Sequence, residues 1–278
     1  MLKRTRMNES IDLDAYFARI GYAGPRDASL RTLRALCELH PKAIPFENLD
    51  TLMGRVPGLD IAALQAKMIA GARGGYCFEQ NGLMEAALTA LGFPLQGLAG
   101  RVQWGLPVDA PLRPRTHKIL RVTTAEGDWL VDVGFGGLTL TAPLDITSLE
   151  PQDTGHGVFR LQPAGDDLQL QAMAADGWAP KYQLSLDPQQ PWDYEMANWF
   201  VAAHASSPFT SNLICARVLD DRRLGLWNGE LAVRHRDGRV DKSLLDASAL
   251  ALVLVEEFGL PEAAVAAAAA ALERVARL

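Results

Sequence analysis

The sequence contains little cysteine, no long hydrophobic run and no excess of positive charge. Its 278 residues include three cysteines, Cys37, Cys77 and Cys215. An odd number at such wide spacing excludes a disulfide framework and indicates a reducing compartment. No stretch of about 18 uncharged apolar residues occurs, so a transmembrane helix is not expected. The formal net charge of −6 argues against a nucleic-acid partner.

No secretory leader is expected from the first residues. Lys3, Arg4 and Arg6 are not followed by the apolar segment that such a leader contains. The composition, 49% hydrophobic and 22% charged, is that of an ordinary folded protein and excludes global disorder. We therefore expect a folded cytoplasmic protein without a membrane partner.

Hydrophobic periodicity divides the chain into three regions, and the expected fold class is α+β. Residues 1–92 are predicted to form a helical domain, with helices over 29–40, 61–70 and 77–91. Residues 93–190 are predicted to form an antiparallel sheet or barrel from strands over 95–104, 117–124, 129–133, 158–162, 168–173 and 182–186. Residues 191–278 combine helices over 192–205, 245–258 and 261–278 with strands over 213–219 and 231–236.

Cys77 is the strongest candidate for a reactive side chain. It follows Gly74 and Gly75, which permit a tight turn, and it stands where the third predicted helix begins. Free backbone N–H groups and the helix dipole favour a thiolate there, with a pKa below the ordinary value of about 8.5. The alternative is a buried structural cysteine, which suits Cys37 and Cys215 better.

A nucleophilic cysteine needs a base, and the base needs a group that orients it. His117 opens a predicted strand, and Asp132 lies inside an otherwise apolar one. A buried carboxylate is costly unless it is paired, and a histidine on a neighbouring strand would pair it. A hairpin centred on residues 126 and 127 would bring position 117 towards 136, so this pairing needs an offset. The alternative for Asp132 is a turn or edge residue.

Metal and nucleotide motifs are incomplete. Cys37 and His40 lack a second pair of ligands, so no structural zinc site is expected. The glycines over 134–137 resemble part of a dinucleotide fingerprint, but no helix pattern follows and the third glycine is misplaced. We expect no metal site.

Three segments together resemble the signatures of the arylamine N-acetyltransferase family. They are residues 73–81 (RGGYCFEQN), 116–117 (TH) and 131–137 (VDVGFGG), and the stretches 44–49 and 207–212 agree as well. The resemblance extends over the whole chain in the family's order, at the length of a bacterial member. It implies a helical domain, an antiparallel β-barrel and a lid-like α/β third domain, with Cys77, His117 and Asp132 in a papain-like arrangement.

The resemblance also implies a ping-pong acetyl transfer. Acetyl-CoA would be a co-substrate, no cofactor would be bound permanently, and the acceptor would be a small aromatic amine, hydrazine or N-hydroxyarylamine. Cys77 would carry the acetyl group, His117 would hold and pass the proton, and Asp132 would orient His117. The residues implied to line the substrate site are Phe46, Val102, Thr116, Gly134, Phe135 and Phe209. Core packing is the alternative for the three phenylalanines and Val102. Arg73 and Glu47 are expected to form a buried pair that supports the catalytic turn.

Two other functions use the same residues. A thiol hydrolase or a transglutaminase-like acyltransferase would pass the acyl group to water or lysine, but the apolar phenylalanines favour a small aromatic acceptor. An acyl-CoA-binding regulatory protein that has lost activity is disfavoured by the intact triad. Both a monomer and a homodimer are compatible with the sequence.

Overall fold

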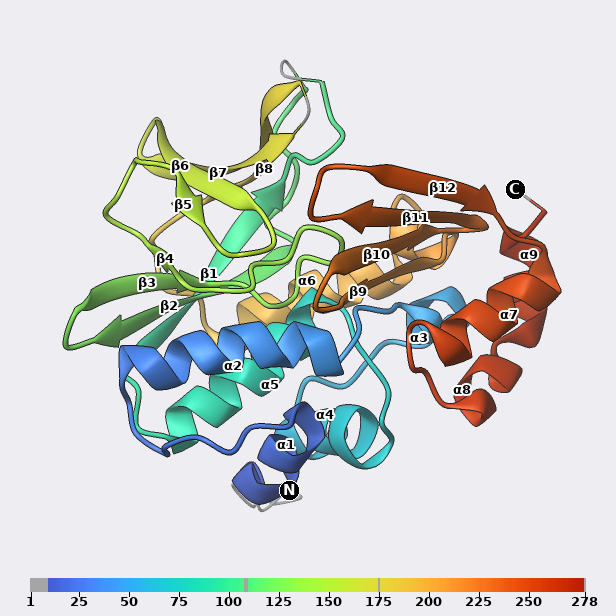
Figure 1. Ribbon diagram of the computed structural model, residues 1–278, viewed down its shortest axis with the longest axis horizontal. Helices are drawn as coiled ribbons and strands as arrows, with labels where there is room; N and C mark the ends of the chain where they lie inside the picture. Colours follow the sequence, from blue (N-terminus) through green and yellow to red (C-terminus); the bar gives the residue numbers. More distant parts are fainter. Residues whose placement is uncertain (1–9, 108–109, 175, 278) are drawn as a thin grey trace, which may run out of the picture.

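The structure, a computed structural model, describes residues 10–107, 110–174 and 176–277. The basic residues Lys3, Arg4 and Arg6, and Leu278 at the end of the last predicted helix, lie outside these ranges. Figure 1 shows the helices of the first region on one side of the large sheet, with a smaller sheet and the last helices beside them. None of the described helices is long and apolar enough to cross a membrane.

The first region is helical, as predicted. Its elements are α1 (Leu13–Ile20), α2 (Leu30–Ala43), α3 (Leu49–Leu52), α4 (Ile61–Leu64), the π-helix η1 (Gln65–Ala70) and α5 (Cys77–Ala90). The side chains of Asp12, Ser29 and Asp60 each accept a hydrogen bond from the backbone three residues later, and so begin α1, α2 and α4. α2 continues past its predicted end because Pro41, in the last turn, removes only one backbone hydrogen bond.

The second region is an eight-stranded antiparallel sheet that curls into a nearly closed barrel. Its strands are β1 (Leu95–Val102), β2 (His117–Thr124), β3 (Gly127–Val131), β4 (Leu144–Asp145), β5 (Gln152–Asp153), β6 (Val158–Ala164), β7 (Asp167–Ala174) and β8 (Gly177–Leu184). Their order is β4-β3-β2-β1-β8-β7-β6-β5, which leaves β4 and β5 at the edges. The Gln152 side chain bridges these edges: it accepts from the Asp145 N–H at 2.8 Å and donates to the Asp145 carbonyl at 3.0 Å.

Two hydrophobic cores meet at β2. Because alternate residues of a strand face opposite sides, Ile119 enters the core inside the barrel. Leu120 and Val122, by contrast, join the core of the helical region, where they pack with residues of α2 and α5 such as Leu33 and Leu88. This packing holds α5 against β2.

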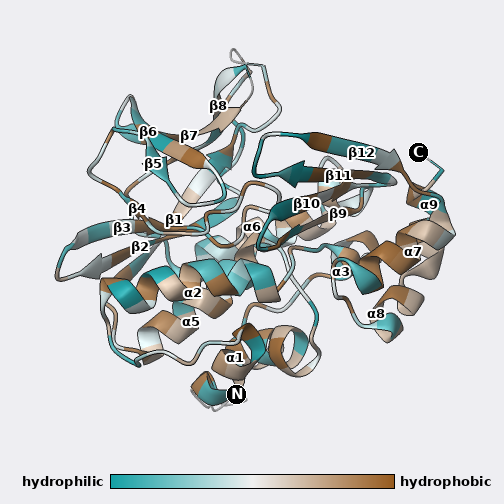
Figure 2. Ribbon diagram, in the orientation of Figure 1, coloured by the Kyte–Doolittle hydropathy of each residue, from teal (hydrophilic) through white to brown (hydrophobic). Residues whose placement is uncertain are grey.

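The third region combines a four-stranded antiparallel sheet with helices. Its elements are α6 (Pro191–Ala203), the 3-10 turn η2 (Pro208–Thr210), β9 (Ile214–Val218), β10 (Arg222–Trp227), β11 (Glu230–His235), β12 (Val240–Leu244), α7 (Ala247–Glu256), α8 (Glu262–Ala267) and α9 (Ala269–Val275). β10 and β12 were not predicted. Figure 2 shows α7 as largely hydrophobic, and its Leu250 and Leu254 are fully buried. Leu49 and Leu52 of α3 belong to the same core, so the first region reaches into the third.

Candidate active site

Cys77 is the first residue of α5, and the chain before it makes a tight turn. A Cβ on Gly74 would lie 2.0 Å from the Pro45 carbonyl oxygen, so only glycine fits there. The Tyr76 N–H donates to the Glu79 carboxylate at 3.1 Å, which caps the helix. The Cys77 N–H forms no hydrogen bond with any described residue, as expected at the start of a helix.

The segment around Phe46 joins this turn to the third region. Its backbone pairs with Gly75 on one side and with Ala216 of β9 on the other. Gln80 reinforces the junction, because its amide donates to the Pro45 carbonyl at 2.8 Å and to the Gly75 carbonyl at 3.1 Å. The Gln80 carbonyl oxygen in turn lies 2.7 Å from Nε2 of the buried His40. No role for Gln80 was predicted from the sequence, although Gln80 is part of the cysteine motif.

A buried cluster of charges lies beside the turn. Arg73 donates to Glu47 at 2.8 and 3.1 Å, as expected, and also to Asp50 at 2.9 Å. Lys67 on η1 contacts Asp50 and Glu79, each at 2.7 Å. Burial raises the pKa of Glu79 to about 7, although Lys67 opposes this shift. Only the Arg73–Glu47 pair of this cluster was expected from the sequence.

His117 opens β2, and Asp132 directly follows β3. The hairpin between the strands pairs Thr124 with Gly127, so its centre lies one residue earlier than predicted. If this register is continued by one residue beyond β3, Asp132 lies opposite Ile119. Ile119 is two positions from His117 and faces the same side of the sheet. Diagonal neighbours of this kind are within reach of each other. His117 Nε2 lies 2.8 Å from Asp132 Oδ2, so the pair forms without the alignment that we expected.

Asp132 is fully buried and held from several directions. Its Oδ1 accepts from Asn81 Nδ2 at 3.0 Å and from the Gly134 N–H at 3.1 Å. Burial alone would raise the pKa of the carboxyl, but the charge and hydrogen bond of His117 hold this pKa well below its usual range. β3 ends two residues before its predicted end because the Val133 N–H donates to Asn81 instead of continuing the sheet.

The Cys77 sulfur lies against the backbone on both sides of His117. The thiol donates to the Thr116 carbonyl at 3.6 Å, and the N–H groups of Lys118 and Phe78 point to the sulfur. Burial nevertheless raises the pKa of the thiol to about 12. This direction is opposite to the predicted one, because the helix terminus does not offset the loss of water around a residue that is 5% exposed. Ionisation therefore requires a proton acceptor inside the site.

The phenylalanines expected to line the substrate site form two separate groups. The ring of Phe135 meets the imidazole of His117 edge-on, with the centroids 5.2 Å apart. The rings of Phe46 and Phe209 lie 6.3 Å from each other. Val102 is half-buried at the end of β1.

Gly134 lies directly against Cys77. A Cβ at this position would be 2.9 Å from Cys77 Cα and 2.9 Å from Asn81 Nδ2. Such contacts are too short for any larger residue, so glycine allows the chain after Asp132 to pass close to the start of α5.

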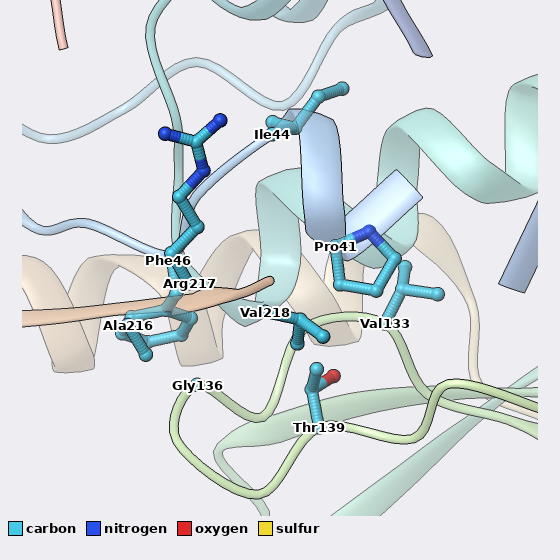
Figure 3. A pocket seen from close by; sticks show the side chains of 9 residues that line it. All are labelled: Pro41, Ile44, Phe46, Val133, Gly136, Thr139, Ala216, Arg217 and Val218. Atoms are coloured by element: carbon cyan, nitrogen blue, oxygen red, sulfur yellow. The ribbon is translucent and has the colours of Figure 1, made fainter. Parts of the chain in front are cut away.

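Phe46 also lines a small hollow between α2, β9 and the loop after Asp132. Figure 3 shows its lining: Pro41, Ile44, Phe46, Val133, Gly136, Thr139, Ala216, Arg217 and Val218. Cys77, His117 and Asp132 are not part of this lining. The hollow thus adjoins the candidate site without containing its reactive groups.

The other two cysteines are packing residues, as predicted. Cys37 is buried in the helical core, and Cys215 in the core of the third region. His40 bonds to Tyr16 at 2.9 Å and to Gln80, both within the protein interior. Within the described ranges, no group of three or more His, Cys, Asp and Glu side chains is arranged to hold a metal ion.

Asn81 and Tyr182 contact Asp132 and His117, respectively, and neither contact was predicted from the sequence. Asn81 donates to the Lys118 carbonyl at 2.7 Å as well as to Asp132. Its place four residues after Cys77, on the same helix face, is the signal that could have revealed it. Tyr182 of β8 lies with its ring 5.0 Å from that of His117, and nothing in the local sequence indicates this long-range contact.

Comparison with known proteins identifies the family. A family model described as N-acetyltransferase matches residues 29–265. The arylamine N-acetyltransferase of Mycobacterium tuberculosis is 43% identical over 256 residues, which cover 90% of this chain and 90% of that protein. The chain belongs to the arylamine N-acetyltransferase family. It is therefore an enzyme of the acyltransferase class.

Two further relatives inform the function. The arylamine N-acetyltransferase / N-hydroxyarylamine O-acetyltransferase of Salmonella typhimurium is 39% identical over 250 residues, which cover 89% of this chain and 88% of that protein. The structure of Mycobacterium marinum arylamine N-acetyltransferase in complex with CoA matches with a TM-score of 0.90 and 42% identity, over 96% of this chain and 99% of that one. The predicted combination of helical region, antiparallel barrel and α/β region is thus confirmed as the fold of this family.

Proposed function

We propose that this protein transfers the acetyl group of acetyl-CoA to small aromatic amines and hydrazines, and to the oxygen of N-hydroxyarylamines. The observation that carries the proposal is the buried His117–Asp132 pair, 2.8 Å long, beside a cysteine at the start of a helix. The CoA complex of the Mycobacterium marinum relative supports acetyl-CoA as the donor. The Salmonella relative supports the oxygen acceptor.

In the first half-reaction, Cys77 attacks the thioester carbonyl of acetyl-CoA. Because burial raises the pKa of the thiol to about 12, its proton passes to His117 within the site rather than to water. Asp132 stabilises the resulting imidazolium. The unpaired Cys77 N–H donates to the oxyanion. Collapse of the tetrahedral intermediate breaks the bond to CoA, whose thiolate takes the proton from His117.

In the second half-reaction, the acceptor attacks acetylated Cys77. His117 accepts the proton from the attacking amine, and Cys77 leaves as the thiolate. Acetyl-CoA is consumed as a co-substrate, so this cycle needs no permanently bound cofactor. The proposed substrate contacts are Phe46, Val102, Thr116, Gly134, Phe135 and Phe209.

The proposed domains contribute different parts of the site. Cys77 comes from the helical domain, residues 1–92, and His117 and Asp132 come from the barrel, residues 93–190. Phe209 comes from the third domain, residues 191–278. Arg73 and Glu47 are proposed to support the turn before Cys77. The cysteines are all free thiols, which supports the proposal of a reducing, cytoplasmic location.

The proposal is tested by intact mass after brief exposure to acetyl-CoA. We expect one added acetyl group that maps to Cys77 and is discharged by an arylamine. No adduct in the wild type, or the same adduct in Cys77→Ala, would overturn it. An adduct that disappears equally fast without any amine would indicate a hydrolase instead.

A further inference from the structure

Lys181 is a fully buried lysine inside the barrel, and a β-bulge places it there. In the pairing of β7 with β8, Leu170 lies opposite Tyr182 and Gln171 lies opposite Pro180, so Lys181 is the extra residue. Neighbouring strand residues normally face opposite sides. The bulge lets Lys181 and Tyr182 both be fully buried, and bulges of this kind re-aim side chains next to active sites.

The ammonium of Lys181 lies close to the triad. Its Nζ donates to the Leu138 carbonyl at 2.8 Å and lies 4.3 Å from the ring centre of Phe135 and 4.9 Å from that of Phe159. The same Phe135 ring meets His117 edge-on. Phe135 therefore contacts both the lysine cation and the proposed base.

Burial of the Lys181 ammonium costs folding free energy unless a favourable interaction offsets that cost. Within the described ranges Lys181 forms no ion pair with a carboxylate. The charged and titratable groups that face it are Asp132, Arg223, Tyr182 and, across Phe135, His117. Burial lowers the pKa of Lys181 to about 7, which Asp132 opposes and Arg223 reinforces. Lys181 is thus protonated below neutral pH.

The net charge of Cys77, His117 and Asp132 indicates what the Lys181 ammonium contributes. When Cys77 has passed its proton to His117, the thiolate, the imidazolium and the Asp132 carboxylate sum to one negative charge in a buried site. When Cys77 and His117 are both protonated the same group is neutral, so loss of the thiol proton adds one negative charge, and the nearby Lys181 cation favours that loss.

We propose that Lys181 is a positioning residue that balances the charge of the ion-paired triad and holds Phe135 against His117. The proposal rests on the roles proposed above for Cys77, His117 and Asp132. It requires that loss of the Lys181 charge makes the Cys77 thiolate harder to form. It also requires that a neutral side chain able to bond Leu138 does not restore the thiolate.

The test compares Lys181→Met with Lys181→Gln, which keeps a donor for Leu138 but has no charge. The readout is the rate at which iodoacetamide alkylates Cys77 between pH 4 and 7, followed by peptide mass. Both variants should react about 3- to 10-fold more slowly than the wild type, with the midpoint of the profile at least about 0.5 pH unit higher. Lys42→Met is the matched control, because Lys42 is a partly buried lysine on α2 that pairs with Glu38 and Asp220.

Unchanged profiles in both variants would overturn the proposal. So would a shift in Lys181→Met that Lys181→Gln reverses, because the Leu138 bond rather than the charge would then be responsible. Both variants remove a buried charge that faces Asp132, so the melting temperature of each is measured first; if one variant is unfolded at the assay temperature, the other supplies the comparison. Alkylation needs no acyl donor, so the shift in the alkylation profile can appear even if acetyl-CoA fails to label Cys77. Failure of that labelling would refute the proposed function alone.

Discussion

Replacing Arg73 by alanine should destabilise the whole fold, because it breaks the buried cluster beside the turn before Cys77. The Glu47 side chain is fully buried, and Arg73 is its main cationic partner. Breaking a buried ion pair by removing one partner costs about 3–5 kcal/mol. Arg73 keeps 16% of its side chain exposed, and Lys67 remains 3.9 Å from Glu47. We therefore expect the lower end, about 3 kcal/mol.

The assay is thermal unfolding followed by circular dichroism. For a chain of this size, about 2–4 °C is lost per kcal/mol, so the melting temperature of Arg73→Ala should fall by about 6–12 °C. Arg121→Ala is the control, since Arg121 pairs with Asp128 at the surface, where ion pairs contribute about 0–1 kcal/mol. A melting curve for Arg73→Ala that matches the wild type, or falls no further than that of Arg121→Ala, would refute the reasoning.

Three other substitutions test the site and its surroundings. Gly134→Ala would place a methyl group 2.9 Å from Cys77 Cα and should slow acetylation of Cys77 at least about tenfold by intact mass, whereas Gly137→Ala, with open space around it, should not. Equal rates in the two variants would contradict the steric argument. Asp132→Asn should slow the same acetylation at least about a hundredfold, because His117 loses its charged partner; a near-normal rate would count against the triad. Burial lowers the pKa of His40 from 6.5 to about 4. This residue therefore contributes about 3 kcal/mol to the free energy of unfolding, which is present in full above pH 6.5 and is lost as the pH falls through 4. The melting temperature of His40→Gln should therefore approach that of the wild type as the pH falls from 6.5 to 4, and a constant difference would refute this.

Local patterns predicted the two elements that carry Cys77 and His117. The strand that begins at His117 was predicted with its exact ends, and the helix that begins at Cys77 to within one residue. These patterns are reliable because β2 is buried on both faces and bounded by turns, while α5 follows two glycines. The fold class followed from the same periodicities.

Long-range contacts were out of reach of the sequence. The centre of the hairpin lies one residue before its expected position, and this displacement changes which residues of β2 and β3 are paired. The resulting register determines how His117 contacts Asp132. The bulge at Lys181 exists only as a mismatch between two strands, so neither strand encodes it alone. Lys67 joins the Arg73 cluster through a π-helix, where a regular helix was predicted.

Asn81 explains how two separate regions place their reactive groups with the precision that the proposed chemistry needs. It lies four residues after Cys77 on α5, so one helical turn sets its distance from the sulfur. Its amide binds the Lys118 carbonyl of β2 and the Asp132 carboxylate, and its oxygen accepts from the Val133 N–H. Any slide of α5 along β2 must break these bonds before it can separate Cys77 from the histidine pair. The relative position of Cys77 and His117, the proposed nucleophile and base, therefore depends on this buried amide as well as on the packing of α5 against β2.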